Sequence, residues 1–155
     1  MTFQIHALDQ RDFAHLFDLP ETELIRRGIR RVVADTNPGY PCRVSLQDAQ
    51  IGEDLLLLNH HHLRSDGPYD GRHAIYVRRN AITCTPAPGD VPEQLSRRLL
   101  SVRGFGADQM MRAAEVVQGT GLAQTLHRLL ADPSISFVDI HNAGPGCYAA
   151  RATRA

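Results

Sequence analysis

The chain contains no lysine, so all 17 of its basic residues are arginine. This absence excludes mechanisms that need a lysine amine, among them Schiff-base catalysis, attachment of pyridoxal phosphate and the lysine-bearing P-loop. Genome composition could explain the bias, but the chemical exclusion holds either way.

Long hydrophobic runs and an export signal are also missing. The longest apolar run, residues 55–58, is far shorter than the ~20 residues that a bilayer-spanning helix needs. The first nine residues lack the basic segment followed by an apolar one that marks a secretory signal. We therefore expect a cytoplasmic protein that does not enter a membrane.

The charge of the chain shows no excess of either sign. The basic residues are balanced by 17 acidic ones, which gives a formal net charge of zero. Dedicated binders of nucleic acid or anionic membranes carry a basic excess. The arginine groups at 26–31 and 97–98 are more simply read as solvated faces, so no nucleic-acid partner is expected.

Cysteine is scarce, with Cys42, Cys84 and Cys147 the only three. An odd number without an export signal predicts reduced thiols and no obligatory disulfide. Their spacing matches neither a CxxC pair nor a zinc finger.

The length and the hydrophobic patterning predict one domain, residues 1–155, of the α+β class. We expect an antiparallel or mixed sheet with three to four short helices packed on it. The predicted helices lie at 9–17, from Pro20 to about Gly28, and at 120–131 with Thr120 as cap. The predicted strands are 3–8, 29–34, 53–59, 73–78, 99–105, 110–117, 135–141 and 147–153.

Several segments resemble a known family. They are PGYPCRVSL at 38–46, the segment at 55–59 with the histidines after it, Pro68-Tyr69, LSVR at 100–103 and HNAGPGCYAAR at 141–151. These segments are similar to those of the bacterial family called domain of unknown function 1203, over nearly the whole chain. The resemblance implies a stand-alone bacterial domain of this length and supplies no activity.

The first candidate for chemistry is the segment that joins His141 to Cys147. If residues 142–146 form the loop of a hairpin, these two residues face each other at its mouth, where opposed Cβ atoms lie about 4.5–5.5 Å apart. Asp139 lies two residues back on the same strand face and could orient the imidazole. Such a trio fits an activated thiol, with the glycines of the loop offering N–H groups to an oxyanion. The alternative is a buried cysteine and a histidine bonded to a turn carbonyl.

The second candidate is a stiff loop that presents Cys42 and Arg43. Pro38 and Pro41 restrict the backbone there, and arginine on a rigid loop suits capture of a carboxylate or phosphate. Arg103, within a predicted strand, is a second candidate clamp, and we add Tyr148 to the ligand-binding residues. The alternative is that Arg43 braces the fold by bonding loop carbonyls.

The third candidate is the run His60-His61-His62. On a strand, His60 and His62 share one face while His61 points away, so at most two of them could bind one metal ion. A run at a strand end followed by Arg64-Ser65-Asp66 is more typical of a solvated turn. We therefore predict no metal site, and keep His60 and His62 as the candidates if one exists.

Two hypotheses remain open at this point. The first is a domain that binds a small anionic ligand through Arg43, and that is a thiol-dependent enzyme if Cys147 and His141 form an activated pair. The second is a metal-stabilised or protein-interaction module without catalytic activity. The sequence indicates neither a cofactor nor an oligomeric state.

Overall fold

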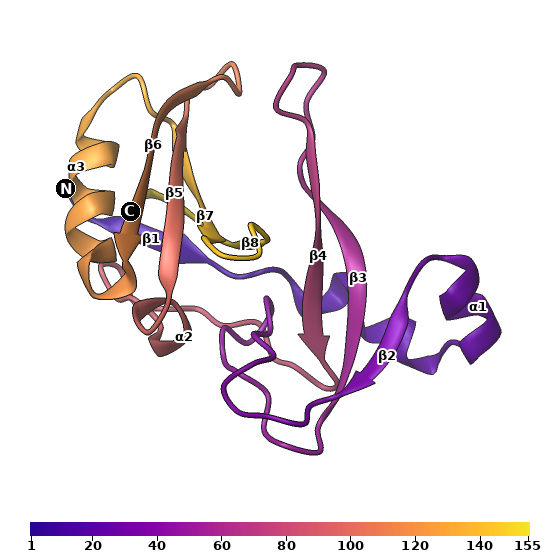
Figure 1. The fold of residues 1–155 in the computed structure, drawn as a ribbon. Helices are drawn as coiled ribbons and strands as arrows, with labels where there is room; N and C mark the ends of the chain where they lie inside the picture. Colours follow the sequence, from indigo (N-terminus) through magenta and orange to yellow (C-terminus); the bar gives the residue numbers. More distant parts are fainter.

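The computed structural model describes residues 1–155, and its strands form two antiparallel sheets (Figure 1). The five-stranded sheet has the order β1-β8-β7-β5-β6 and the three-stranded sheet the order β2-β3-β4. The strands of the larger sheet are β1 (Phe3–His6), β5 (Leu99–Phe105), β6 (Met111–Gln118), β7 (Phe137–Asn142) and β8 (Tyr148–Arg154). Those of the smaller sheet are β2 (Arg30–Val33), β3 (Asp54–Leu63) and β4 (Gly71–Arg78).

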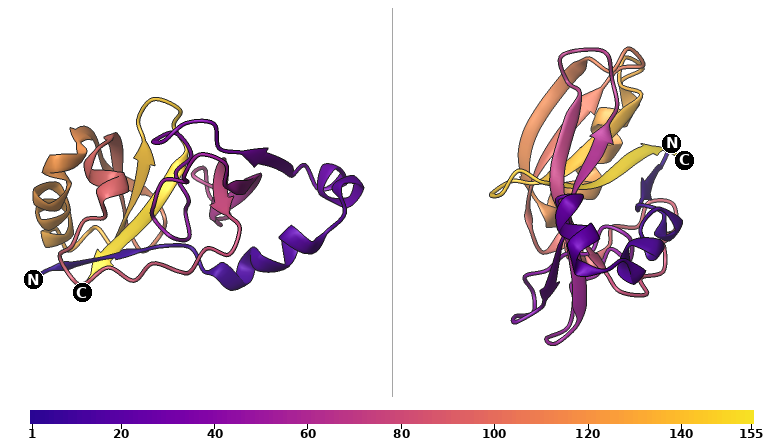
Figure 2. Two further views of the ribbon diagram at one scale, coloured as in Figure 1. Left: turned by 90° about the horizontal axis from the view of Figure 1, so that it is seen from below. Right: turned by 90° about the vertical axis from the view of Figure 1, so that its right-hand side faces the viewer.

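The helices are short. The α-helices are α1 (Glu21–Arg26), α2 (Glu93–Ser96) and α3 (Leu122–Ala131), and the 3-10 helices are η1 (Gln10–Asp12), η2 (Ala14–Asp18) and η3 (Gly119–Gly121). Helices α1 and α3 lie at opposite ends of the molecule, as the turned views show (Figure 2), and α2 packs near the 42–48 loop. The predicted α+β class is confirmed, with the strands divided between two sheets. No helix has the length and apolar character needed to cross a bilayer.

The larger sheet is held by an apolar core beneath α3. Leu122, Leu126, Leu129 and Leu130 of this helix are buried at helical spacing, as the sequence predicts. They join Val138 and Ile140 of β7 and the alanines of β8 in one cluster of 16 buried residues. Burial of apolar surface at ~25 cal/mol per Å² makes this cluster the main source of stability for its half of the molecule.

The smaller sheet has a core of its own. A second cluster of eleven buried residues includes no residue of the first. Its members include Phe13 between η1 and η2, Phe17 of η2, and Leu56 and Leu58 of β3. The two apolar cores therefore lie on either side of the region where β3 and β4 approach β7 and β8.

The segment at 40–48 connects the two halves. It has little regular structure, but its main-chain groups bond both sides: Arg43 N–H donates to Tyr76 O of β4 at 3.1 Å, and Arg43 O accepts from Leu8 N–H at 2.9 Å. Val44 O accepts from Cys84 N–H at 2.8 Å. These bonds satisfy the buried backbone of a loop that no strand ladder covers.

Some local predictions need correction. Residues 9–17 form two 3-10 helices instead of one helix, although Asp9 does cap the first by accepting from Arg11 N–H at 2.9 Å. Gly121, not Thr120, precedes α3, and no side chain caps it. Gly28 does follow α1 with a φ of +74°, the left-handed conformation expected at this position.

The segments of α2 and η3 pack closely at Gly119. A Cβ built at Gly119 would lie 2.0 Å from Leu95 O and 2.7 Å from the carbonyl carbon of Ser96, both main-chain atoms of the α2 segment. Gly119→Ala should therefore lower the free energy of unfolding by about 1–3 kcal/mol, measured by urea denaturation. Gly121→Ala is the matched control, because nothing lies within 4 Å of its Cβ position. Equal stability of the two variants would contradict the close approach.

Candidate functional site

Polar and aromatic side chains fill the seam between the two sheets. Alternation along each strand places them there: on β7, Val138 and Ile140 enter the apolar core, while Asp139 and His141 face β3. On β3, one face carries Leu56 and Leu58 and then His60 and His62. We call His60, His62, His73 and His141, with Tyr148, the histidine cluster.

The histidine run lies inside β3 and not in a turn. β3 extends to Leu63, and His60 pairs with His73 of β4 in the ladder. The expectation of a solvated turn is therefore wrong. The predicted division of faces is confirmed, because His60 and His62 both pack near Tyr148 while His61 Nε2 lies 2.6 Å from Asp70 Oδ1.

The rings of the cluster are in van der Waals contact. His62 is central: its ring centroid lies 4.8 Å from that of His73, 5.0 Å from that of His141 and 5.1 Å from that of Tyr148, on which it stacks. The His73 and His141 centroids are 5.1 Å apart. Four of the chain's eight histidines are thus gathered in one place.

Burial keeps members of this cluster uncharged. It lowers the pKa of His60 to about 4, with repulsion from His62 and Arg64 adding to the effect. It lowers the pKa of His141 to about 3, although the bond to Gly146 O opposes the shift. Burial also raises the pKa of Tyr148 above its ordinary value. At neutral pH these side chains offer lone pairs and no net charge.

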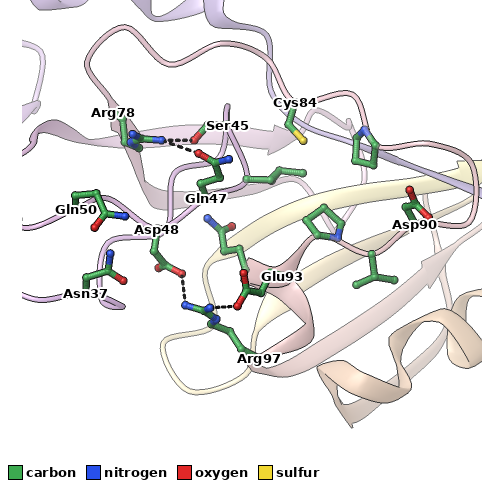
Figure 3. A pocket seen from close by; sticks show the side chains of 15 residues that line it. Asn37, Ser45, Gln47, Asp48, Gln50, Arg78, Cys84, Asp90, Glu93 and Arg97 are labelled. Carbon is green, nitrogen blue, oxygen red and sulfur yellow. Dashed lines mark hydrogen bonds and ion pairs between the residues drawn. The ribbon is translucent and has the colours of Figure 1, made fainter.

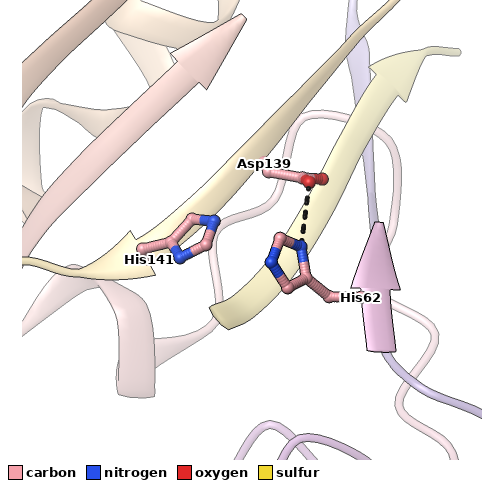
Figure 4. A group of neighbouring side chains, drawn as sticks. All are labelled: His62, Asp139 and His141. Carbon is pink, nitrogen blue, oxygen red and sulfur yellow. Dashed lines mark ion pairs between the residues drawn. The ribbon is translucent and has the colours of Figure 1, made fainter. Parts of the chain in front are cut away.

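Asp139 is the one carboxylate in the seam, and it is fully buried (0 % exposed). Arg151 donates to both of its oxygens, from Nε at 2.7 Å and from Nη2 at 3.0 Å. Burial alone would raise the pKa of Asp139, but His62 and Arg151 outweigh it and the net shift is downward. His62 Nδ1 lies 3.4 Å from Asp139 Oδ2, as Figure 4 shows.

The register predicted for the hairpin mouth is wrong by one residue. A β-bulge after Ile140 pairs His141 with Tyr148, so Cys147 lies in the connection and bonds Asn142. His141 Nδ1 bonds Gly146 O at 3.0 Å, and its ring meets His62 and His73. His141 and Asp139 do share a strand face, as predicted, but the structure shows no hydrogen bond from either to the Cys147 sulfur. Their catalytic roles stay a prediction.

Cys147 instead contacts Arg43. The guanidinium donates from Nη2 to Cys147 Sγ at 2.9 Å, from Nε to Tyr148 O at 2.7 Å and from Nη1 to Pro41 O. Asn142 Nδ2 also donates to the sulfur, at 3.5 Å. Arg43 is only 1 % exposed, and burial lowers its pKa while the two nearby cysteines oppose the shift. The alternative that Arg43 bonds loop carbonyls agrees with two of these contacts.

A cavity of about 750 Å³ opens beside these residues. The ionisable and polar side chains that line it are Arg43, His73, Tyr76, Arg98, Asn142 and Cys147. No aspartate or glutamate lines it. Both predicted segments, the 38–43 loop and the connection between β7 and β8, contribute to its wall.

Three predicted ligand-binding residues do not line this cavity, and the first is Tyr148, which stacks on His62 in the histidine cluster. Cys42 is fully buried, and its sulfur accepts from Ser45 N–H at 3.5 Å and Arg78 N–H at 3.3 Å. Arg103 bonds Ser101 Oγ at 3.1 Å on its own strand. Neither lines the cavity beside Cys147. The second arginine there is Arg98, which was expected on a solvated face but has a side chain only 18 % exposed.

A second cavity, of about 670 Å³, lies between the 45–50 loop and α2 (Figure 3). Its charged side chains are largely paired with one another. Arg78 bonds Ser45 Oγ and Gln47 Oε1, while Arg97 pairs with Asp48 and Glu93. Because these groups satisfy one another, this cavity has less to offer a ligand than the one beside Cys147.

The comparisons with known proteins now place the chain. The family described as "Protein of unknown function (DUF1203)" matches residues 39–154. The chain belongs to this family. The match begins at the 38–43 loop and ends in β8, so it includes every residue of the histidine cluster and both arginines of the cavity. No curated protein and no solved structure matches the chain significantly.

Four residues of the site, His73, Arg98, Asn142 and Arg151, were missed by sequence reasoning. Asn142 and Arg151 lie within the HNAGPGCYAAR segment that carries the family resemblance, which was the available signal. His73 stands alone in the sequence, and only the pairing of β3 with β4 brings it to His62. Nothing local could have pointed to it.

Acid should destabilise the metal-free protein through the neutral histidines. In the unfolded chain His60 takes up a proton near its ordinary pKa of 6.5, whereas in the folded chain it does so only near 4. Stability is therefore present above pH 6.5 and is lost as the pH falls from 6.5 towards 4. The free energy of unfolding can fall by at most ~1.4 kcal/mol per pH unit for one such histidine. We expect a fall of about 1 kcal/mol per pH unit, because the ring is partly exposed.

Urea unfolding between pH 7 and pH 5, in buffer with EDTA, measures this slope. His60→Gln should make it shallower. His15→Gln, at an exposed position outside the cluster, should leave it unchanged. The explanation fails if the slope of His60→Gln equals that of the parent protein.

Proposed function

We propose that the cavity beside Cys147 binds a small molecule with an anionic group and presents the cysteine sulfur to it. The observation that carries the proposal is the contact between Arg43 and Cys147. The cavity, its charge and its neighbouring polar groups then define what it can bind.

A buried guanidinium needs a counter-charge, because an unpaired charge away from water costs several kcal/mol. Arg43 has two main-chain carbonyls and the Cys147 sulfur as its hydrogen-bond partners. Arginine can only donate, so the sulfur must accept, and the thiolate is the better acceptor. Cys147 is thus the one ionisable partner of Arg43.

The wall of the cavity favours an anion. It combines Arg43, Arg98 and His73 with no carboxylate, although Asp48 pairs with Arg98 at 2.5 Å from outside the wall. Leu57, Leu99 and Pro145 add apolar surface. A compact molecule with one anionic group and an apolar part would satisfy both kinds of surface.

Asn142 offers a further contact. Its Nδ2 donates to the cysteine sulfur, while its buried Oδ1 has no partner within the protein. A donor group on a ligand could bond this oxygen, which would orient the ligand against the sulfur. Gly144, at the rim, leaves the backbone of the connection accessible to an oxyanion.

If the site is catalytic, Cys147 is its nucleophile. Its counter-ion is Arg43, because burial holds His141 uncharged and its Nδ1 faces Gly146 O. His141 and Asp139 would then support the site from the seam. We assign proton transfer to His73, because it is the histidine that lines the same cavity as the sulfur.

Alkylation tests the access of the sulfur and the charge of the cavity together. Iodoacetamide is neutral and iodoacetate is a small anion, so the ratio of their rates at each cysteine, resolved by peptide mass from pH 6 to 9, reports the charge around each sulfur. Relative to Cys84, Cys147 should prefer iodoacetate. Cys84 is the internal control: burial raises the pKa of its thiol, so its rate should climb through the alkaline range.

Two variants complete the test. Arg43→Met should abolish the preference of Cys147 for iodoacetate, provided that circular dichroism shows a folded protein. Arg98→Gln leaves the sulfur contact intact and should reduce this preference without abolishing it. A ratio of iodoacetate to iodoacetamide rates at Cys147 equal to that at Cys84 would refute the proposal.

A further inference from the structure

We propose that His62, Asp139 and His141 are the protein ligands of a divalent transition-metal ion. The three side chains converge in the seam from β3 and β7 (Figure 4), and their donor atoms all lie within 4.8 Å of one another. The proposal rests on atoms other than the Cys147 sulfur, so it can hold or fail independently of the proposed function.

The tautomer of His141 supports the site. Its Nδ1 lies 3.0 Å from Gly146 O, and a carbonyl can only accept, so Nδ1 carries the proton. Nε2 then bears a lone pair. That atom is buried, in a residue that is 0 % exposed, and has no hydrogen-bond partner. A histidine fixed through one nitrogen by a backbone carbonyl, with the other free, is the arrangement found in metal-ligating histidines.

His62 provides the second free nitrogen. Its Nδ1 is buried and makes no well-formed hydrogen bond, although Asp139 Oδ2 lies 3.4 Å away. Donor atoms bound to one tetrahedral ion at ~2.1 Å lie about 3.4 Å apart. The His62–Asp139 separation already has that value, and the donor atom of His141 lies within 4.8 Å of the other two.

Asp139 supplies the negative charge, and Arg151 holds it in place. The bonds from Arg151 to both carboxylate oxygens fix its orientation, as outer partners do for metal-ligating carboxylates. The positive charge of Arg151 also weakens attraction for a cation. We therefore expect weaker binding than in a structural four-thiolate site, and dependence on all three ligands.

The donor set indicates which ions fit. Two imidazole nitrogens and one carboxylate suit zinc, iron(II) or cobalt(II), and suit calcium and magnesium poorly. Three protein ligands are the number found in catalytic zinc sites, which keep one position for water or substrate. His73 packs against both histidine ligands and also lines the cavity beside Cys147, so this metal site adjoins that cavity.

Titration of the untagged, EDTA-treated full chain with Co²⁺ and Zn²⁺ tests the site. The parent protein should bind one equivalent of Co²⁺ with d–d absorption and without a sulfur-to-cobalt charge-transfer band. His62→Gln should weaken Zn²⁺ binding at least tenfold. His61→Gln is the matched control, because His61 is adjacent in the chain but its side chain bonds Asp70 outside the seam. The affinity of this variant for Zn²⁺ should lie within about twofold of that of the parent protein.

A measurement without any substitution guards against a variant that fails to fold. In imidazole ¹⁵N spectra of the parent protein, Zn²⁺ should shift His62 Nδ1 and His141 Nε2 and leave His15 unchanged. The proposal is overturned if the parent chain binds no stoichiometric metal, if folded His62→Gln binds as well as His61→Gln, or if a charge-transfer band shows that a cysteine is the ligand.

Discussion

The arrangement of the two sheets depends on the hydrogen bonds of Arg43. Its side chain bonds Tyr148 O at the start of β8 and the Cys147 sulfur, while its main chain bonds Tyr76 O of β4 and Leu8 N–H. One buried residue thereby joins both sheets and the N-terminal segment. A lysine could not replace it, because a single ammonium lacks the planar fork that reaches three acceptors in fixed directions.

The seam between the two sheets is polar because neither sheet has an apolar face left to bury there. Each sheet satisfies its apolar face with its own core, so the surfaces that remain to meet are the opposite face of β7 and the distal ends of β3 and β4. The face of β3 changes from Leu56 and Leu58 to His60 and His62 along its length. Imidazole suits such a position, because it packs as an aromatic ring and keeps a polar edge.

Sequence patterning predicted the elements well and the site only in part. Strand alternation correctly put Asp139 with His141, and His60 with His62, because period two is a local property. The hairpin register failed because β7 extends to Asn142, so that Asn142 and not His141 bonds Cys147, and periodicity does not show where a strand gives way to its turn. The nearness of Arg43 to Cys147, across 104 positions, depends on tertiary packing that no local pattern encodes.

The two proposed sites lie side by side and would hold ligands of opposite charge, which links the two proposals physically. The seam gathers histidine nitrogens around Asp139, and this is where we propose a cation. The cavity wall has two arginines and no carboxylate, and this is where we propose an anion. His73 belongs to both. A ligand anion in the cavity would therefore lower the electrostatic cost of a metal ion in the seam, and a bound metal would strengthen anion binding in turn, because coupling between two sites is reciprocal.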